Sequence, residues 1–231
     1  SLYGWYIYPT TGTSPYPAII ALHAYNGNRS GVIYHAALLA EHGYAILAMD
    51  LRAHGESEGE VFAFGWDAAQ DVYAALDYLQ NRPDANPQRI GALGLSIGAE
   101  IALAAAGQNH ELRAVVAEGC GIRSFSDWMM VPSTPGYIDI PGAWWFWKSA
   151  EFLTGQRQPV SLLEMTARIS PNALLLISAG KENEFAAKLY EAAGEPKIHW
   201  QRSERGHIDA IFKHPQEYKQ TVINFLDAAL K

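Results

Sequence analysis

Two stretches of the sequence match the pattern Gly-x-Ser-x-Gly, in which a serine held at a sharp turn acts as a nucleophile. They are GESEG at residues 55–59 and GLSIG at residues 94–98. Random placement of the glycines and serines gives roughly 0.1 accidental matches, so the pattern alone does not choose between Ser57 and Ser96. The turn functions only where a buried strand runs into a helix, and that context separates the two serines.

Ser96 has this context. The apolar run RIGALGL predicts a buried strand that ends directly before Ser96, and IGAEIALAAA predicts an Ala-rich helix directly after it. Gly94 and Gly98 leave room where a strained turn brings the strand and the helix together. We therefore expect Ser96 to be the nucleophile.

Ser57 lacks this context. It follows Asp50 by seven residues in a run of Glu, Gly and Ser, with no strand before it and no apolar helix after it. We expect Ser57 to be a loop residue and Asp50 to tie down this loop through Arg52.

A serine hydroxyl needs a base near neutral pH, and the base needs a carboxylate to orient it. His207 lies in SERGHIDA, a loop between the strand-like KIHWQR and the closing helix, so it follows Ser96 in the chain and stands at a strand end. For the acid, the apolar run ALLLISAG leads into Glu182 and Glu184. We favour Glu182, with Glu184 as the alternate acid and Glu118, which ends an earlier strand, as a third candidate.

An oxyanion formed at Ser96 needs two N–H donors. The backbone N–H of Ile97 begins the helix after the serine, where the positive end of the helix dipole also acts. The loop HAYNG follows the apolar run PAIIALH, and the backbone N–H of Tyr25 in this loop is the expected second donor.

The interval from Gly121 to about Ser170 is Pro-interrupted and aromatic, and it holds four of the seven tryptophans. We expect a cap-like insertion at about 121–170 over one end of the sheet. Stacked aromatic side chains give apolar area of fixed shape, so this insertion predicts a pocket for an apolar acyl or aryl group. The expected substrate-binding residues are Tyr25, Trp128, Trp144 and Trp145.

Apolar runs alternate with helix-like segments along the rest of the chain. This alternation predicts an α/β protein with a mostly parallel sheet covered by helices on both faces, and a single domain over residues 1–231. The expected strands are 17–23, 44–50, 89–95, 112–119, 173–180 and 197–202, and the expected helices are 31–42, 67–80, 97–106 and 216–230.

Composition excludes several classes of function. The net charge is -7 and the sequence has no run of basic residues, so it does not predict a positively charged surface that binds nucleic acid. The single Cys120 excludes an internal disulfide, zinc-type spacings are absent, and we expect neither a metal nor an organic cofactor. No apolar run approaches the roughly 18 residues of a membrane span. The chain starts without Met at the strand-like SLYGWYIY, so we expect that a leader, anchor or first strand preceded it; the localisation stays open.

The segments LHAYNG, DLRAHGESEG, GLGLSIG and RGHID, in the order serine, acid, histidine, resemble the α/β-hydrolase superfamily over nearly the whole chain. The closest resemblance is to small dienelactone-hydrolase-like and serine aminopeptidase-like esterases. It implies that Ser57 belongs to a structural loop. This sequence departs from the family at Ala24, Ala53 and Ala99, which replace glycines, and in having Glu where the acid is more commonly Asp.

The sequence thus predicts a serine hydrolase that cleaves small carboxylic esters through a Ser-His-Glu triad and an acyl-enzyme intermediate. One alternative is the same machinery acting on a lactone, thioester, peptide or polyester. An alternative from another class is a non-catalytic, hydrolase-like protein that binds a small ligand.

Overall fold

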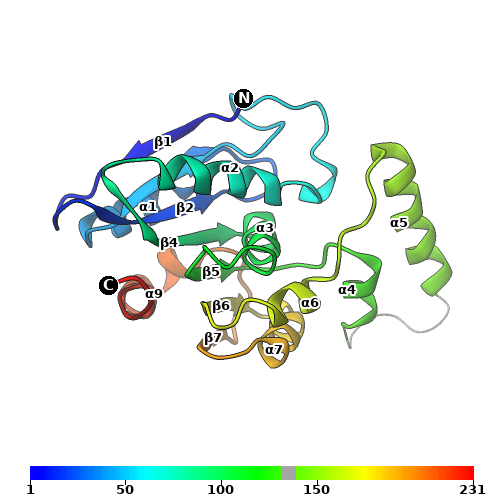
Figure 1. The fold of residues 1–231 in the computed structure, drawn as a ribbon. Helices are drawn as coiled ribbons and strands as arrows, with labels where there is room; N and C mark the ends of the chain where they lie inside the picture. Colours follow the sequence, from blue (N-terminus) through cyan, green and yellow to red (C-terminus); the bar gives the residue numbers. More distant parts are fainter. Residues whose placement is uncertain (132–138) are drawn as a thin grey trace.

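The computed structural model describes residues 1–131 and 139–231. Its centre is a seven-stranded sheet in the order β1-β3-β2-β4-β5-β6-β7 (Figure 1). Only β1 is antiparallel to its neighbour, and the other neighbouring pairs are parallel. The strands are β1 (Gly4–Ile7), β2 (Tyr16–Leu22), β3 (Ala45–Met49), β4 (Ala85–Leu95), β5 (Ala114–Glu118), β6 (Ala173–Ala179) and β7 (Lys197–Arg202).

Most of the α-helices flank this sheet, and in the part of the chain that the structure describes two short 3₁₀ helices, Arg29–Val32 and Ala63–Gly65, lie in loops. The α-helices of the described residues are α1 (Ile33–Glu41), α2 (Ala69–Gln80), α3 (Ile97–Ala106), α4 (Phe125–Met129), α5 (Ile140–Thr154), α6 (Leu162–Ala167), α7 (Glu182–Ala192), α8 (Ala210–Lys213) and α9 (Pro215–Leu230). The predicted α/β class, with a mostly parallel sheet covered on both faces, is confirmed.

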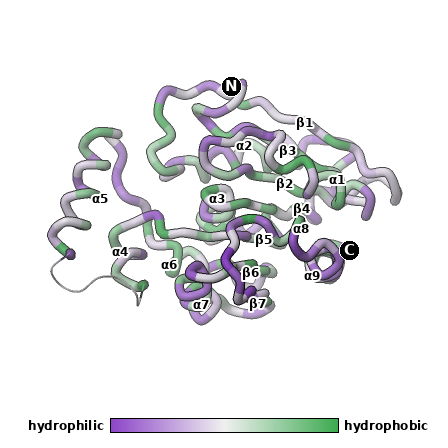
Figure 2. The backbone as a smooth tube through the Cα atoms, turned by 180° about the vertical axis from the view of Figure 1, so that it is seen from behind, coloured by the Kyte–Doolittle hydropathy of each residue, from purple (hydrophilic) through white to green (hydrophobic). Residues whose placement is uncertain are grey.

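Two apolar cores lie on opposite faces of the sheet. Successive side chains of a strand point to opposite faces, so Ile20 of β2 packs with α2 and α3, whereas Ile19 packs with α1 and α9. Because both faces are covered, the central strands are continuous apolar runs, which Figure 2 shows as hydrophobic colour along the middle of the molecule. This burial explains why the strands could be predicted from short apolar runs alone.

The segment after β5 contains three helices of the described chain, α4, α5 and α6. The helix α6 packs against α3 and α7, close to the sheet. By contrast, α5 stands well away from the sheet (Figure 1). Residues 132–138 of the predicted insertion lie outside the described residues.

The loop that contains the first Gly-x-Ser-x-Gly motif is held by Asp50, but not through Arg52 as expected. The fully buried Asp50 carboxylate accepts hydrogen bonds from the backbone N–H groups of Arg29 and Glu56, at 2.6 and 2.9 Å, and it pairs with the Arg29 guanidinium. Arg52 instead pairs with Asp71 of α2 at 2.7 Å. The loop is therefore fixed by Arg29, which lies in the 3₁₀ helix after β2 and is 21 residues from Asp50 in the sequence, so local sequence does not indicate this contact.

Candidate active site

Ser96 occupies the turn between β4 and α3. Its backbone has φ 53° and ψ −119°, a conformation that L-residues rarely adopt. The turn is held by hydrogen bonds on both sides: the Ser96 N–H donates to the Glu118 carbonyl at 2.8 Å, and the Ser96 carbonyl accepts from the Ala99 N–H at 2.8 Å. Surrounding structure thus imposes a strained backbone on one half-buried serine, as a nucleophile turn requires.

The glycines on either side of Ser96 permit this turn. A Cβ on Gly94 would lie 2.2 Å from the carbonyl oxygen of Gly98. A Cβ on Gly98 would lie 2.5 Å from the carbonyl oxygen of Leu22 and 2.7 Å from that of His23. The close approach brings the start of α3 against the loop that follows β2, where Tyr25 lies.

Replacing Gly94 by alanine is expected to lower the free energy of unfolding by about 3 kcal/mol, because the new methyl group meets a backbone oxygen that cannot rotate away. Gly142→Ala is the matched control. It lies in α5, where a Cβ would meet no atom of the described residues within 4 Å, so alanine should raise stability by up to about 1 kcal/mol. Urea unfolding of both variants measures the difference, and equal stabilities would contradict the steric explanation.

His207 lies between Ser96 and Glu182. The Ser96 hydroxyl donates to His207 Nε2 across 2.9 Å, and His207 Nδ1–H donates to Glu182 Oε1 across 2.5 Å. The other carboxylate oxygen of Glu182 accepts from the Ala179 N–H at 3.3 Å. The hydrogen bond that the His207 ring donates to Glu182 is the main cause that raises the pKa of His207 above its ordinary value, while partial burial lowers it.

The three candidate acids have different surroundings. Glu182 is the first residue of α7 and reaches His207, whereas Glu184 of the same turn is exposed. Glu118 is buried at the end of β5, and its Oε1 accepts from the Ala210 N–H at 3.0 Å. Burial raises the pKa of Glu118 to about 7. Glu118 therefore holds the chain that follows the histidine loop and makes no hydrogen bond to the His207 ring.

The two expected oxyanion donors lie on either side of the contact at Gly98. Ile97 begins α3, and Tyr25 lies in the turn after β2. Within the described part of the chain, neither N–H donates to another residue, so both remain available to a ligand. His23 orders the start of this turn: Nδ1–H donates to the Ala24 carbonyl at 2.8 Å, and Nε2 accepts from the Leu51 N–H at 3.1 Å.

The predicted pocket aromatics lie on three different elements. Tyr25 is 55% exposed, and its ring contacts those of His54 and Phe62 at centroid distances of 6.2 and 6.0 Å. Trp128 of α4 stacks on Phe125, with centroids 5.8 Å apart. The other two, Trp144 and Trp145, are exposed neighbours on α5 that meet edge to face. Tyr25 thus adjoins the expected oxyanion loop, and the role of the three tryptophans in substrate binding stays a prediction.

Ser57 of the first Gly-x-Ser-x-Gly motif is a structural residue. Its buried hydroxyl donates to the Asp50 carbonyl at 2.7 Å and accepts from the Tyr3 N–H at 2.9 Å. Both partners are backbone groups, and no base is hydrogen-bonded to the hydroxyl.

One buried acid in the helix that follows Ser96 was not anticipated. Glu100 lies one turn after Ser96 in α3, and its Oε1 accepts from the Gly121 N–H at 2.9 Å. Burial raises the pKa of Glu100 to about 7. Nearby, the buried Arg123 donates to the carbonyls of Gly65 and Trp66 at 2.9 and 3.1 Å. The signal in the sequence was a single charged residue inside an otherwise apolar helix.

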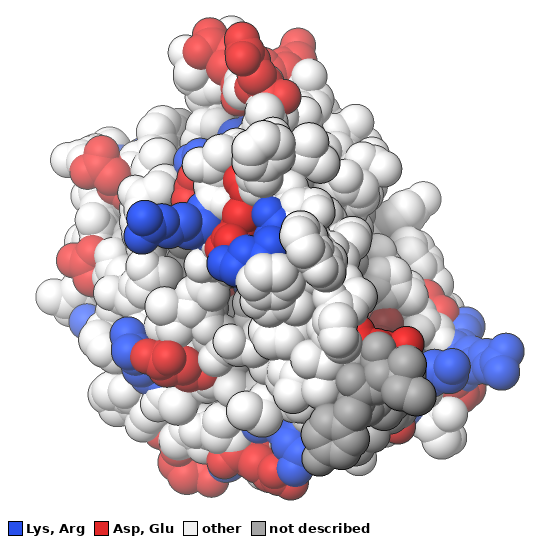
Figure 3. Space-filling model, turned by 90° about the vertical axis from the view of Figure 1, so that its right-hand side faces the viewer, with Lys and Arg blue, Asp and Glu red and all other residues white. Residues whose placement is uncertain are grey.

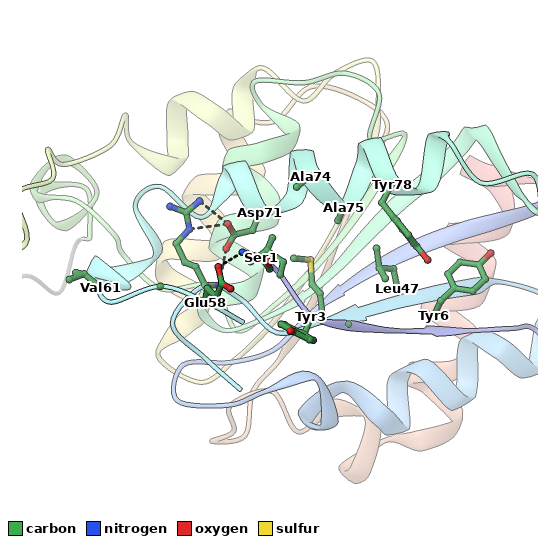
Figure 4. Close-up of a pocket in the computed structure, with 15 residues that line it drawn as sticks. Ser1, Tyr3, Tyr6, Leu47, Glu58, Val61, Asp71, Ala74, Ala75 and Tyr78 are labelled. Carbon is green, nitrogen blue, oxygen red and sulfur yellow. Dashed lines mark hydrogen bonds and ion pairs between the residues drawn. The ribbon is translucent and has the colours of Figure 1, made fainter. Parts of the chain in front are cut away.

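A hollow of about 900 Å³ lies away from these residues, between the first strand and α2 (Figure 4). Ser1, Tyr3 and Tyr6 line one side, and Ala75 and Tyr78 of α2 line the other. None of the proposed reacting groups lines it. Among the residues that the structure describes, no group of three or more His, Cys, Asp or Glu is arranged to hold a metal ion.

The sheet topology and the strained strand-to-helix turn at Ser96 define a member of the α/β-hydrolase superfamily. The chain matches the X-Pro dipeptidyl-peptidase (S15) family over residues 5–215, and it belongs to that family. Together with the esterases that share its fold, this membership identifies the protein as a hydrolase.

Similar proteins come from several organisms. The esterase Pf2001 from Pyrococcus furiosus has a TM-score of 0.74 and 25% identity, over 100% of this chain and 88% of that chain. The acetyl xylan esterase from Paenibacillus sp. R4 has a TM-score of 0.74 over 99% of this chain and 80% of that one; its 21% identity shows the fold alone. The uncharacterized protein YfhR of Escherichia coli O157:H7 is 29% identical, over 99% of this chain and 77% of the relative.

Proposed function

We propose that the protein hydrolyses carboxylic esters through a Ser96-His207-Glu182 triad and an acyl-enzyme intermediate. The observation that carries the proposal is the continuous hydrogen-bond chain from the Ser96 hydroxyl through both ring nitrogens of His207 to the Glu182 carboxylate, at 2.9 and 2.5 Å. A nucleophile, a base and an orienting acid in this order are the requirement for acyl transfer by serine.

In the proposed reaction, Ser96 Oγ attacks the ester carbonyl while its proton moves to His207 Nε2. The negative charge that develops on the carbonyl oxygen is stabilised by the N–H groups of Ile97 and Tyr25 and by the N-terminal end of α3. Collapse of this intermediate breaks the bond to the alcohol, which takes the proton from His207. Water then repeats the sequence with His207 as base, releasing the acid and restoring Ser96. Glu182 stays ionised and stabilises the imidazolium.

A peptide substrate is the second candidate, because the family is named for an X-Pro dipeptidyl-peptidase. The ester proposal is supported by the fold shared with the Pyrococcus furiosus esterase and the acetyl xylan esterase. Fold does not fix substrate, so the two candidates require a direct comparison.

The deciding experiment compares p-nitrophenyl esters of increasing acyl length with an Xaa-Pro p-nitroanilide on the wild-type protein. We expect saturable hydrolysis of the esters, labelling by a fluorophosphonate, and little or no release of nitroaniline. Efficient release from the Xaa-Pro substrate alone would establish the peptidase instead. If the protein neither labels nor turns over any of these substrates, the non-catalytic ligand-binding alternative would replace the proposal.

A further inference from the structure

The helix α5 contacts the rest of the protein through very few of its side chains. Of its fifteen residues, only Trp147 and Ala150 are buried. Trp147 stacks on Trp66 with ring centroids 6.2 Å apart, and it contacts Phe64 at 6.1 Å. A helix whose sequence is largely apolar is therefore attached mainly by one strip, with Ile140 and Ala143 half-buried beside it. At the edge of this strip Phe146 contacts Phe64, with ring centroids 6.2 Å apart, and the remaining large apolar side chains face outward.

These outward side chains are large. Phe152 is 86% exposed, Leu153 80%, Trp145 66%, Phe146 55% and Trp144 43%. Because Trp145 and Phe152 are seven residues apart, they lie on the same side of the helix. Isolated exposed apolar residues are ordinary, but a cluster of five on one helix marks a surface that binds something. We call these five residues the α5 patch.

The chemistry of the surroundings restricts the partner. Residues 139–160 contain two acidic and two basic side chains, Asp139, Glu151, Lys148 and Arg157, and Lys148 pairs with Glu151 at 2.6 Å. The segment thus carries no net charge, and Figure 3, which views the side of the molecule where α5 lies, shows charged side chains of both signs among uncharged ones. A surface without net charge gives an anionic or cationic partner no net electrostatic attraction. The favourable free energy of binding therefore comes from burial of apolar area against an apolar partner.

The position of α5 relates it to the proposed active site. The helix lies toward the carboxyl ends of the parallel strands, and Ser96 follows the carboxyl end of β4 at that same end (Figure 1). A second copy of the chain bound to this patch would crowd the end of the sheet at which substrate enters. A lipid surface would instead present apolar molecules to it.

We propose that the α5 patch docks on the surface of a zwitterionic phospholipid bilayer. Tryptophan favours the boundary between lipid headgroups and acyl chains, because its ring is apolar and its N–H is polar. With fifteen residues the helix is about 22 Å long, shorter than the roughly 30 Å hydrocarbon core, so it lies on the bilayer without crossing it. In a further step that rests on the proposed ester hydrolysis, docking delivers lipid-dissolved esters to Ser96.

The test uses vesicles of pure phosphatidylcholine and measures co-flotation in a density gradient, together with quenching of tryptophan emission by brominated lipid. The wild-type protein is expected to float and to be quenched. Phe152→Ser/Leu153→Ser should lower the partition coefficient by about tenfold or more, because two large apolar side chains no longer enter the lipid. The control is Ile198→Ser, an exposed apolar residue near the amino end of β7, which should float like the wild type.

Hydrolysis of the water-soluble p-nitrophenyl acetate is measured in parallel and should be equal in the three proteins. A wild type that does not float, or a double variant that floats equally well, overturns the docking surface. So does a dimer in size-exclusion chromatography that the double variant abolishes, since a second copy would then be the occupant. Flotation without any ester turnover leaves the docking surface standing and overturns the proposed function alone.

Discussion

Ser96→Ala is expected to reduce kcat for p-nitrophenyl esters by about 10⁵- to 10⁶-fold, because the alanine has no group that can form the acyl-enzyme. The remaining activity comes from substrate positioning and the oxyanion donors, which the substitution leaves in place. The folded state should survive, since the Ser96 hydroxyl donates only to His207 and the turn is held by backbone hydrogen bonds. Steady-state kinetics and circular dichroism of the purified variant measure both effects.

The chain supplies its own control for this experiment, because Ser57 lies in the same Gly-x-Ser-x-Gly pattern. Ser57→Ala should leave kcat within about twofold of the wild type, because its hydroxyl contacts no base. It should lower the free energy of unfolding by about 2 kcal/mol, since the Tyr3 N–H and the Asp50 carbonyl lose a buried partner. The reverse pattern, with activity lost in Ser57→Ala and retained in Ser96→Ala, would show that Ser57 is the nucleophile and that the assignment to Ser96 is wrong.

The fold was predictable wherever local pattern and burial agree. The central strands β2, β3, β5 and β6 are buried on both faces, so each is an uninterrupted apolar run that stands out in the sequence. Both termini of α3 were predicted as observed, because the helix begins directly after Ser96 and coincides with the Ala-rich run IGAEIALAAA. The same reasoning places groups at the carboxyl ends of parallel strands on one edge, which is why Ser96, His207 and Glu182 were expected to meet.

Features that depend on distant contacts were not predictable. The partner of Asp50 is Arg29, which only the folded sheet brings close. The sequence from Gly121 to about Ser170 reads as irregular because its prolines and exposed aromatics obscure helical periodicity, yet α5 forms there. Burial of Glu100 depends on packing of α3 against the chain at Gly121, which composition does not reveal.

Glu182→Gln is expected to reduce kcat by about 10⁴-fold, because the amide keeps the shape of the side chain but does not stabilise the imidazolium or enforce the tautomer in which Nε2 accepts from Ser96. Glu184→Gln is the matched control, because Glu184 lies two residues later in the first turn of α7 and is exposed, and the kcat of this variant should be unchanged. Equal losses in the two variants, or a larger loss at Glu184, would reassign the acid. Esterase kinetics with active-site titration by a fluorophosphonate separate lower kcat from misfolded protein.

The same pair of variants tests the electrostatic role of Glu182 through pH. The hydrogen bond from His207 to the Glu182 carboxylate raises the pKa of His207, so its loss should move the acidic limb of the kcat/KM profile to lower pH. A raised pKa also favours the folded state, fully below the ordinary pKa of histidine and progressively less as pH rises through the folded value. The stability difference between wild type and Glu182→Gln should therefore be larger at about pH 6 than at about pH 9.

Glu100 and Glu118, the two buried acids with a pKa of about 7, titrate in both proteins. Burial, the main cause of both pKa shifts, is the same in wild type and Glu182→Gln and cancels in the difference between them. What remains as pH changes is the interaction of the carboxylate at position 182 with the imidazolium and, more weakly, with Glu118, whose pKa the charge of Glu182 also raises. A difference that does not change with pH would mean that Glu182 holds the ring by geometry alone.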